Sequence, residues 1–95
     1  MFSVHYNKES QTVYLKGNFD TSRAEEVKSV FEEVKTSVKV DMSELNFISS
    51  SGIGIMVMAF QKLKGAGENI ELVNLNDNIK KVFKVSMLDK VFNIG

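Results

Sequence analysis

The feature that most constrains the fold is a run of three serines and two glycines between two apolar segments. Residues 38–40 before it have the pattern of a short buried strand, and residues 53–63 after it are apolar and long enough for three helical turns. A chain that passes from strand to helix through Ser49, Ser50 and Ser51 presents these residues at a helix N-terminus. The unpaired backbone N–H groups and the helix dipole favour anions there. The pattern therefore predicts a place to hold or attach a phosphate.

The composition is that of one small domain spanning residues 1–95. With 43% hydrophobic and 25% charged residues, the chain can build one globular core. The absence of cysteine and the single histidine, His5, argue against a metal site, and no cofactor is expected. A net charge of zero lacks the basic excess of most nucleic-acid binders. The longest apolar run, residues 53–60, is too short to span a membrane, and no signal peptide is visible, so we expect a cytoplasmic protein.

Hydrophobic periodicity predicts the first elements of the chain. Residues 2–6 alternate apolar with polar and residues 12–15 form an apolar run, which together predict an antiparallel hairpin that ends before Gly17. Ser22 and Glu25 have the spacing of a capping box at the start of an amphipathic helix of about four turns. Residues 38–42 then form a strand, which should lie parallel to the second strand through a right-handed crossover.

The second half of the chain predicts a helix, a strand, a last helix and a short edge strand. The helix that follows the serines is apolar on nearly all sides, so Ile53 or a neighbouring outward residue should be partly exposed. Residues 69–73 form a strand, and Asn74 or Asn76 can cap the last helix. The apolar positions of that helix are Ile79, Val82, Phe83 and Met87, and residues 91–94 can add the edge strand. Strands alternating with helices predict an α/β fold with a mixed sheet.

Residues 41–54 resemble the signature of the STAS domain of bacterial anti-sigma-factor antagonists. The positions that fit are Asp41, Ser43, Leu45, Phe47, Ser50, Ser51, Gly52, Ile53 and Gly54. Residues 17–21 and 82–92 are similar to two further segments of that family, in the same order and spacing. The resemblance implies a single STAS-like domain over residues 1–95, with an antiparallel N-terminal hairpin and helices packed mainly on one face of the sheet.

The resemblance also assigns roles to individual residues. Ser51 matches the family's phosphoacceptor, and Asp20 matches an aspartate that precedes the first helix and lies near it. Many family members carry an aspartate where this chain has Ser49, and that departure bears on recognition by a kinase or a phosphatase. The partner-binding residues implied are Asp20, Ser49, Ser50, Gly52, Ile53 and Gly54. Helix capping is the purely structural alternative for one or two of the serines, and a helix-entry role is the alternative for Asp20.

Enzymatic interpretations each lack a required part. The glycines at 52 and 54 begin a dinucleotide fingerprint, but Val57 stands where its third glycine belongs, and Ile55 replaces a Walker lysine. A nucleophilic Ser51 would have only His5 as a base. We therefore predict a non-enzymatic protein. The resemblance implies an anti-sigma-factor antagonist that binds an anti-sigma factor serine kinase when unphosphorylated, releases a sigma factor, and is reset by a serine phosphatase. The alternative is a STAS-fold scaffold or ligand-sensing subunit of a signalling or transport assembly without a phosphoswitch.

Overall fold

Strands and helices alternate along residues 1–94, the part of the chain that the computed structural model describes. The strands are β1 (Phe2–Asn7), β2 (Thr12–Phe19), β3 (Val38–Ile48), β4 (Ile70–Val73) and β5 (Asn93–Ile94). The α-helices are α1 (Ala24–Glu32), α2 (Ser50–Gly65) and α3 (Asp77–Val85), and two short 3-10 helices are η1 (Thr21–Arg23) and η2 (Leu88–Lys90). None of the helices within residues 1–94 has the length and apolar character needed to cross a lipid bilayer.

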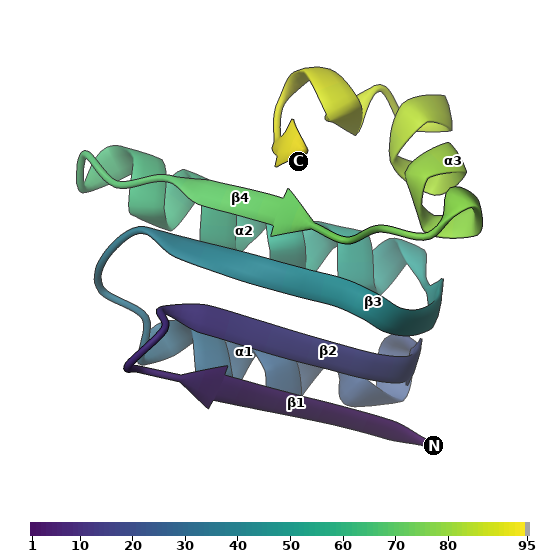
Figure 1. Ribbon diagram of the computed structural model, residues 1–95, viewed down its shortest axis with the longest axis horizontal. Coiled ribbons are helices and arrows are strands. Elements are labelled where there is room, and N and C mark those ends of the chain that lie inside the picture. The colour runs from purple at the N-terminus through teal and green to yellow at the C-terminus, as the bar shows by residue number, and fades with distance from the viewer. Residues whose placement is uncertain (95) are drawn as a thin grey trace.

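The strands form a mixed sheet in the order β1-β2-β3-β4-β5. The hairpin of β1 and β2 is antiparallel, and β2, β3, β4 and β5 follow one another in parallel. Helices α1 and α2 lie side by side behind the sheet, whereas α3 lies beyond β4 at its edge (Figure 1). The structure confirms the mixed sheet, the antiparallel hairpin and the placement of the helices mainly on one face.

The core lies between the sheet and the helices α1 and α2. Side chains that point inward from β3 and β4, such as Val40, Met42 and Leu72, are fully buried, as are Val27 of α1 and Met56 of α2. The residues between them on the strands are partly or fully exposed, because successive side chains of a strand point to opposite faces. One face of the sheet therefore builds the core, and the other carries the polar positions of the strands.

Strands β2 and β3 are both longer than the sequence predicts. β2 continues through Gly17, which has a φ of +88°, and ends at Phe19. β3 continues to Ile48, so the prediction that it ends near residue 42 is wrong. The pairing of the two strands shifts register between Tyr14 and Lys16 and again between Gly17 and Asn18. These irregularities place the buried residues of β3 at Met42, Leu45 and Ile48, a spacing of three that an alternation of two does not detect.

The start of the first helix also differs from the prediction. Asp20, and not Ser22, is the N-cap: its carboxylate accepts a hydrogen bond from the Ser22 backbone N–H, and the chain first forms η1 before α1 begins at Ala24. The capping box was therefore wrong, and α1 is shorter than four turns. An aspartate is as good a cap as a serine, so residue type alone could not distinguish the two positions.

The last helix is capped by Asn76, one of the two predicted candidates. Its side-chain oxygen accepts a hydrogen bond from the Ile79 N–H at 3.0 Å, and its amide donates to the Leu45 carbonyl of β3 at 2.7 Å. The prediction that Met87 belongs to this helix is wrong, because α3 ends at Val85, and Met87 has a φ of +61° and is 62% exposed. The edge strand is confirmed as β5, which pairs with β4.

Asp41 joins β3 to the loop that follows β4. Its carboxylate accepts hydrogen bonds from the Ser43 N–H at 2.9 Å and from the Asn74 amide at 3.0 Å. Partial burial alone would raise the pKa of Asp41, but the hydrogen bonds from Ser43 and Asn74 together outweigh it, so the pKa lies below its ordinary value. This position of the serine-rich signature thus has a structural role.

Asp41→Asn should lower the free energy of unfolding at pH 7 by about 1 kcal/mol, because hydrogen bonds to a charged acceptor are replaced by neutral ones. The folded pKa lies below the unfolded value of about 3.9, so this contribution is present above pH 4 and is lost as the pH falls through the folded pKa. Denaturant titrations from pH 7 to pH 3 measure the difference between the two proteins. A difference that is constant over this range would contradict the assignment.

Candidate functional site

The predicted transition from strand to helix lies where β3 ends and α2 begins. This edge of the molecule, on the right in Figure 1, also holds the end of β2 and the start of α1. The Ser49 N–H donates to the Phe19 carbonyl at 2.9 Å, which fixes the end of β3 against the end of β2. The carboxyl ends of parallel strands thus meet the N-termini of the helices at one place, a common location for sites in α/β proteins.

Ser49 is the N-cap of α2. It has an extended backbone, with φ of −82° and ψ of 170°, and its hydroxyl oxygen accepts a hydrogen bond from the Gly52 N–H at 3.1 Å. Its carbonyl accepts the next helical hydrogen bond, from the Ile53 N–H at 2.9 Å. Capping therefore explains Ser49. It leaves the side chains of Ser50 and Ser51, both exposed, without that structural role.

Ser51 lies in the first turn of α2, and its hydroxyl has a hydrogen-bond partner from another element. The Thr21 hydroxyl of η1 donates a hydrogen bond to the Ser51 hydroxyl oxygen at 3.3 Å. Sequence reasoning missed Thr21, because the two residues are 30 positions apart and meet only where β2 and β3 end side by side. The available signal was its position directly after Asp20, in a segment already associated with the phosphoacceptor.

The hydrogen bonds of Asp20 go to Ser22 and not to Ser51. Both the backbone N–H and the hydroxyl of Ser22 donate to one oxygen of its carboxylate. The hydrogen bond from the Ser22 hydroxyl is the main cause that lowers the pKa of Asp20, so the carboxylate is ionised at neutral pH. The structure thus shows Asp20 in its helix-entry role, with an exposed negative charge one residue before Thr21.

The two glycines of the site have different environments. Gly52 is buried, and a Cβ at this position would lie 2.9 Å from Cγ1 of Ile48 and 3.2 Å from the ring of Phe19. A Cβ on Gly54 would meet nothing within 4 Å. Gly52 is therefore needed for the first turn of α2 to pack on the ends of β2 and β3. Packing gives no reason for Gly54, which lies three residues after Ser51 on the same exposed side of the helix.

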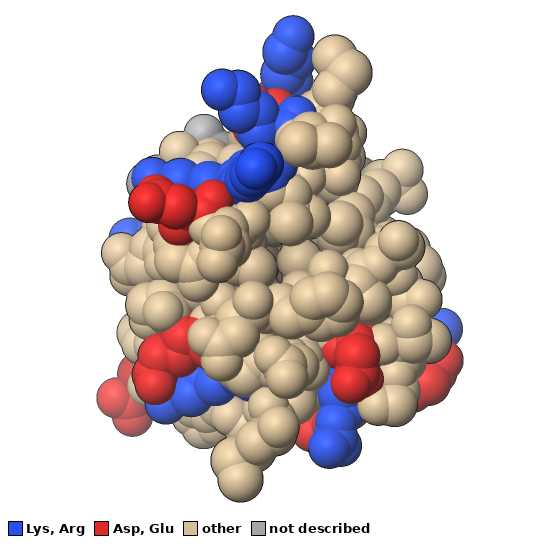
Figure 2. Space-filling model, turned by 90° about the vertical axis from the view of Figure 1, so that its right-hand side faces the viewer, with Lys and Arg blue, Asp and Glu red and all other residues tan. Residues whose placement is uncertain are grey.

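The surface around the serines is only partly polar. Ile53 is partly exposed, as predicted, and Phe47 at the end of β3 is 50% exposed. Figure 2 views this side of the molecule: its middle is largely uncharged, acidic and basic side chains surround it, and basic side chains gather toward the end where the lysines of α3 lie. An uncharged centre with a charged rim is typical of a surface that another protein covers.

Comparisons with family models, curated proteins and solved structures all point to the same family. A family model described as "Mlab, STAS domain" matches residues 2–94. An anti-sigma-B factor antagonist of Listeria monocytogenes is 27% identical over 86 residues, which are 86% of this chain and 75% of that protein. The structure of an anti-sigma factor antagonist from Mycobacterium paratuberculosis superposes with a TM-score of 0.81 at 19% identity, over 99% of this chain and 83% of the other. The structure of the phosphorylated Bacillus cell fate determinant SpoIIAA superposes with a TM-score of 0.72 at 20% identity, over 100% of this chain and 91% of the other.

Proposed function

The chain belongs to the STAS domain family, and we propose that it works as an anti-sigma-factor antagonist, with residues 1–95 as one binding domain. In its unphosphorylated form it binds an anti-sigma factor that is also a serine kinase, and this binding releases a sigma factor. The observation that carries the proposal is the exposed Ser51 hydroxyl in the first turn of α2, which the fold does not use as a cap. The antagonists among its relatives support the same role.

Phosphorylation of Ser51 is the proposed off-switch. A phosphoserine adds a charge of about −1.5 to −2 and three acceptor oxygens. The N-terminus of α2 tolerates this charge because its dipole and free N–H groups favour anions, so the fold survives. A partner that covers the uncharged centre of this surface would have to bury the phosphate without a counter-charge. A loss of about a thousandfold in affinity needs only about 4 kcal/mol, which such burial supplies.

The chain itself contributes no catalysis in this proposal. His5, the only histidine, lies exposed on β1 and pairs in register with Tyr14 of the hairpin, whereas Ser51 lies on α2. The partner kinase therefore supplies the base and the nucleotide, and a separate serine phosphatase removes the phosphate. Ser51 is the substrate of both reactions. The residues proposed to contact the partner are Asp20, Ser49, Ser50, Ile53 and Gly54, and the buried Gly52 supports this surface from within the fold.

A phosphorylation assay tests the proposal directly. The purified chain is incubated with ATP and the anti-sigma factor serine kinase of its host, and intact-mass analysis is followed by mapping of the modified residue. We expect one phosphate per chain, located on Ser51, and the same modification on the protein purified from its host. If the kinase binds but no phosphate is transferred, the scaffold or ligand-sensing function remains and the phosphoswitch is wrong.

Ser49→Asp should preserve the fold and should not slow phosphorylation of Ser51. Aspartate accepts the Gly52 N–H as well as serine does, and its charge is favourable at a helix N-terminus. We therefore expect a free energy of unfolding within about 0.5 kcal/mol of the wild-type value, measured by denaturant titration, and an equal or higher initial rate with the kinase. A marked fall in that rate, with stability unchanged, would show that this serine is required by the chain's own kinase.

A further inference from the structure

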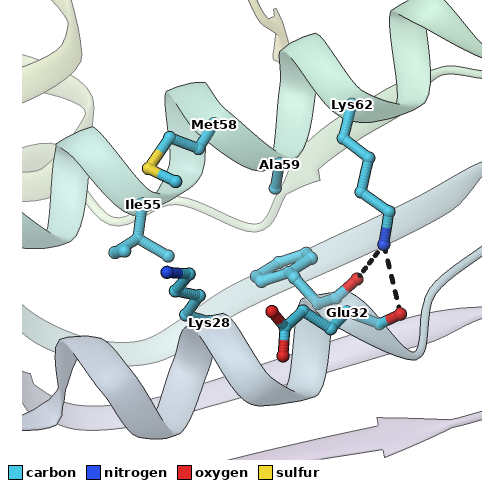
Figure 3. Close-up of a pocket in the computed structure, with 7 residues that line it drawn as sticks. Lys28, Glu32, Ile55, Met58, Ala59 and Lys62 are labelled. Atoms are coloured by element: carbon cyan, nitrogen blue, oxygen red, sulfur yellow. Dashed lines mark hydrogen bonds between the residues drawn. The ribbon is translucent and has the colours of Figure 1, made fainter.

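A groove with an apolar floor lies between α1 and α2, on the side of these helices away from the sheet (Figure 3). Its volume is about 180 Å³, and it is lined by Lys28, Phe31, Glu32, Ile55, Met58, Ala59 and Lys62. Phe31 and Ala59 are buried and form the floor, whereas Met58 is 51% exposed. A large apolar side chain that is half exposed beside a groove is a candidate contact for another molecule.

Lys62 closes the groove at the end farther from Ser51. Its ammonium group donates to the Phe31 carbonyl at 2.9 Å and to the Glu32 carbonyl at 3.2 Å, as the dashed lines in Figure 3 show. These carbonyls belong to the last turn of α1, whose C-terminal dipole favours a cation. Lys62 is thus used within the fold, and Lys28 and Ile55 line the other end of the groove.

The end of the groove opposite Lys62 is the one nearer Ser51 along α2. Ile55 and Met58 follow Ser51 by four and seven residues, so the three side chains lie along one face of α2. Thr21, the hydrogen-bond partner of Ser51, begins η1 directly before α1 and precedes Lys28 of α1 by seven residues. A molecule that covers Ser51 and extends along this face of α2 therefore meets Ile55 first and the groove next.

Lys28 provides a positive charge at this end. Figure 3 shows its ammonium group directed toward Ile55 across the groove. Among residues 1–94 the ion pairs are Lys16 with Glu44 and Arg23 with Glu26, so Lys28 has no such partner within the described part of the chain. Glu32 lines the same groove one helical turn later, but does not form an ion pair with it. A carboxylate on an incoming molecule would complement Lys28.

We infer that this groove receives an apolar side chain of the protein that docks on Ser51, with an acidic residue of that protein pairing with Lys28. This inference rests on the proposed function and extends it by naming a second point of contact. The volume favours a single side chain, since pockets for drug-sized ligands are usually about 300–1,000 Å³. The second contact would hold the partner kinase along α2 while its active site reaches Ser51.

Two methionines of similar exposure allow a matched test. Met58 lines the groove, and Met87 lies after α3, outside it, with an exposed fraction of 62% against 51%. Calorimetric titration with the host's anti-sigma factor serine kinase should show at least tenfold weaker binding for Met58→Gln and less than a twofold change for Met87→Gln. Lys28→Glu should weaken binding, and Lys28→Arg should retain it. Circular dichroism confirms that each variant is folded.

Failure of this inference can be told apart from failure of the proposed function. If the wild-type chain binds the kinase and Ser51→Asp weakens that binding, but Met58→Gln and Met87→Gln behave alike, the groove is not a contact and the proposed function stands. If the wild-type chain does not bind the kinase, both proposals are wrong. If Met58→Gln alone weakens binding and Lys28→Glu does not, the apolar contact is retained and the acidic partner residue is wrong.

Discussion

Ser51→Ala should bind the anti-sigma factor with wild-type affinity and should no longer be switched off by ATP. Alanine removes the acceptor hydroxyl but adds neither charge nor bulk to the contact surface. The free energy of unfolding should change by less than about 0.5 kcal/mol, because Ser49 and not Ser51 caps α2. Ser51→Asp should weaken binding by about tenfold or more, or about 1.4 kcal/mol, although less than phosphoserine does, because aspartate has less charge and fewer oxygens.

The opposite behaviour of these two variants separates a switch from a structural role. A residue that only supports the helix N-terminus would accept aspartate at least as well as serine. Calorimetric titration of both variants against the partner, with and without ATP, measures the affinities, and circular dichroism confirms folding. Equal affinities for the alanine and aspartate variants would remove the phosphoswitch and leave the scaffold function.

Gly52→Ala should lower the free energy of unfolding by about 1–3 kcal/mol, the usual cost of overpacking a core. The new methyl group would lie 2.9 Å from Cγ1 of Ile48 and 3.2 Å from the ring of Phe19, and both side chains are buried. Neither neighbour can move away freely, because each lies at the end of a paired strand and packs in the core. Thermal and denaturant unfolding measure the effect.

Gly54→Ala is the matched control for that substitution. Its methyl group would meet nothing within 4 Å, so the helix should gain up to about 1 kcal/mol from the better helix former. Binding of the partner should nevertheless weaken if the bare backbone beside Ser51 is what lets the partner approach. Equal stability effects at positions 52 and 54 would show that the packing of Gly52 on Phe19 and Ile48 is not what requires glycine there.

The sequence predicts the start of α2 at the serines better than it predicts the strands before it. Ser49, Ser50, Ser51 and Gly52 were placed at a helix N-terminus because serine and glycine after a strand and before an apolar run have few other structural uses. The predicted strand before them ends at residue 42, whereas β3 continues to Ile48. Its buried residues, Met42, Leu45 and Ile48, are three apart, which a uniform alternation cannot reveal, and the register shifts that cause this spacing depend on the neighbouring strand.

Contacts between residues that are far apart in the sequence cannot be predicted from local sequence patterns. Asp20 was identified as a residue near the phosphoacceptor, but its carboxylate is held by Ser22, and Thr21 makes the hydrogen bond to Ser51. Two helix caps could not be chosen from residue type alone: Asp20 or Ser22, and Asn74 or Asn76. In each case the cap is set by the position at which the preceding strand, β2 or β4, ends. Asn76 is the cap of α3 because its amide also donates a hydrogen bond to the Leu45 carbonyl of β3, a contact between distant segments.

The most direct test compares the chain carrying phosphoserine at position 51 with the unmodified chain. Both proteins are titrated calorimetrically against the anti-sigma factor serine kinase of the host, without ATP, after mass analysis has confirmed the modification. We predict a loss of about a thousandfold in affinity on phosphorylation, corresponding to about 4 kcal/mol, with the circular dichroism spectrum unchanged. The same affinity for both proteins would contradict the account, because Ser51 would then not control the interaction.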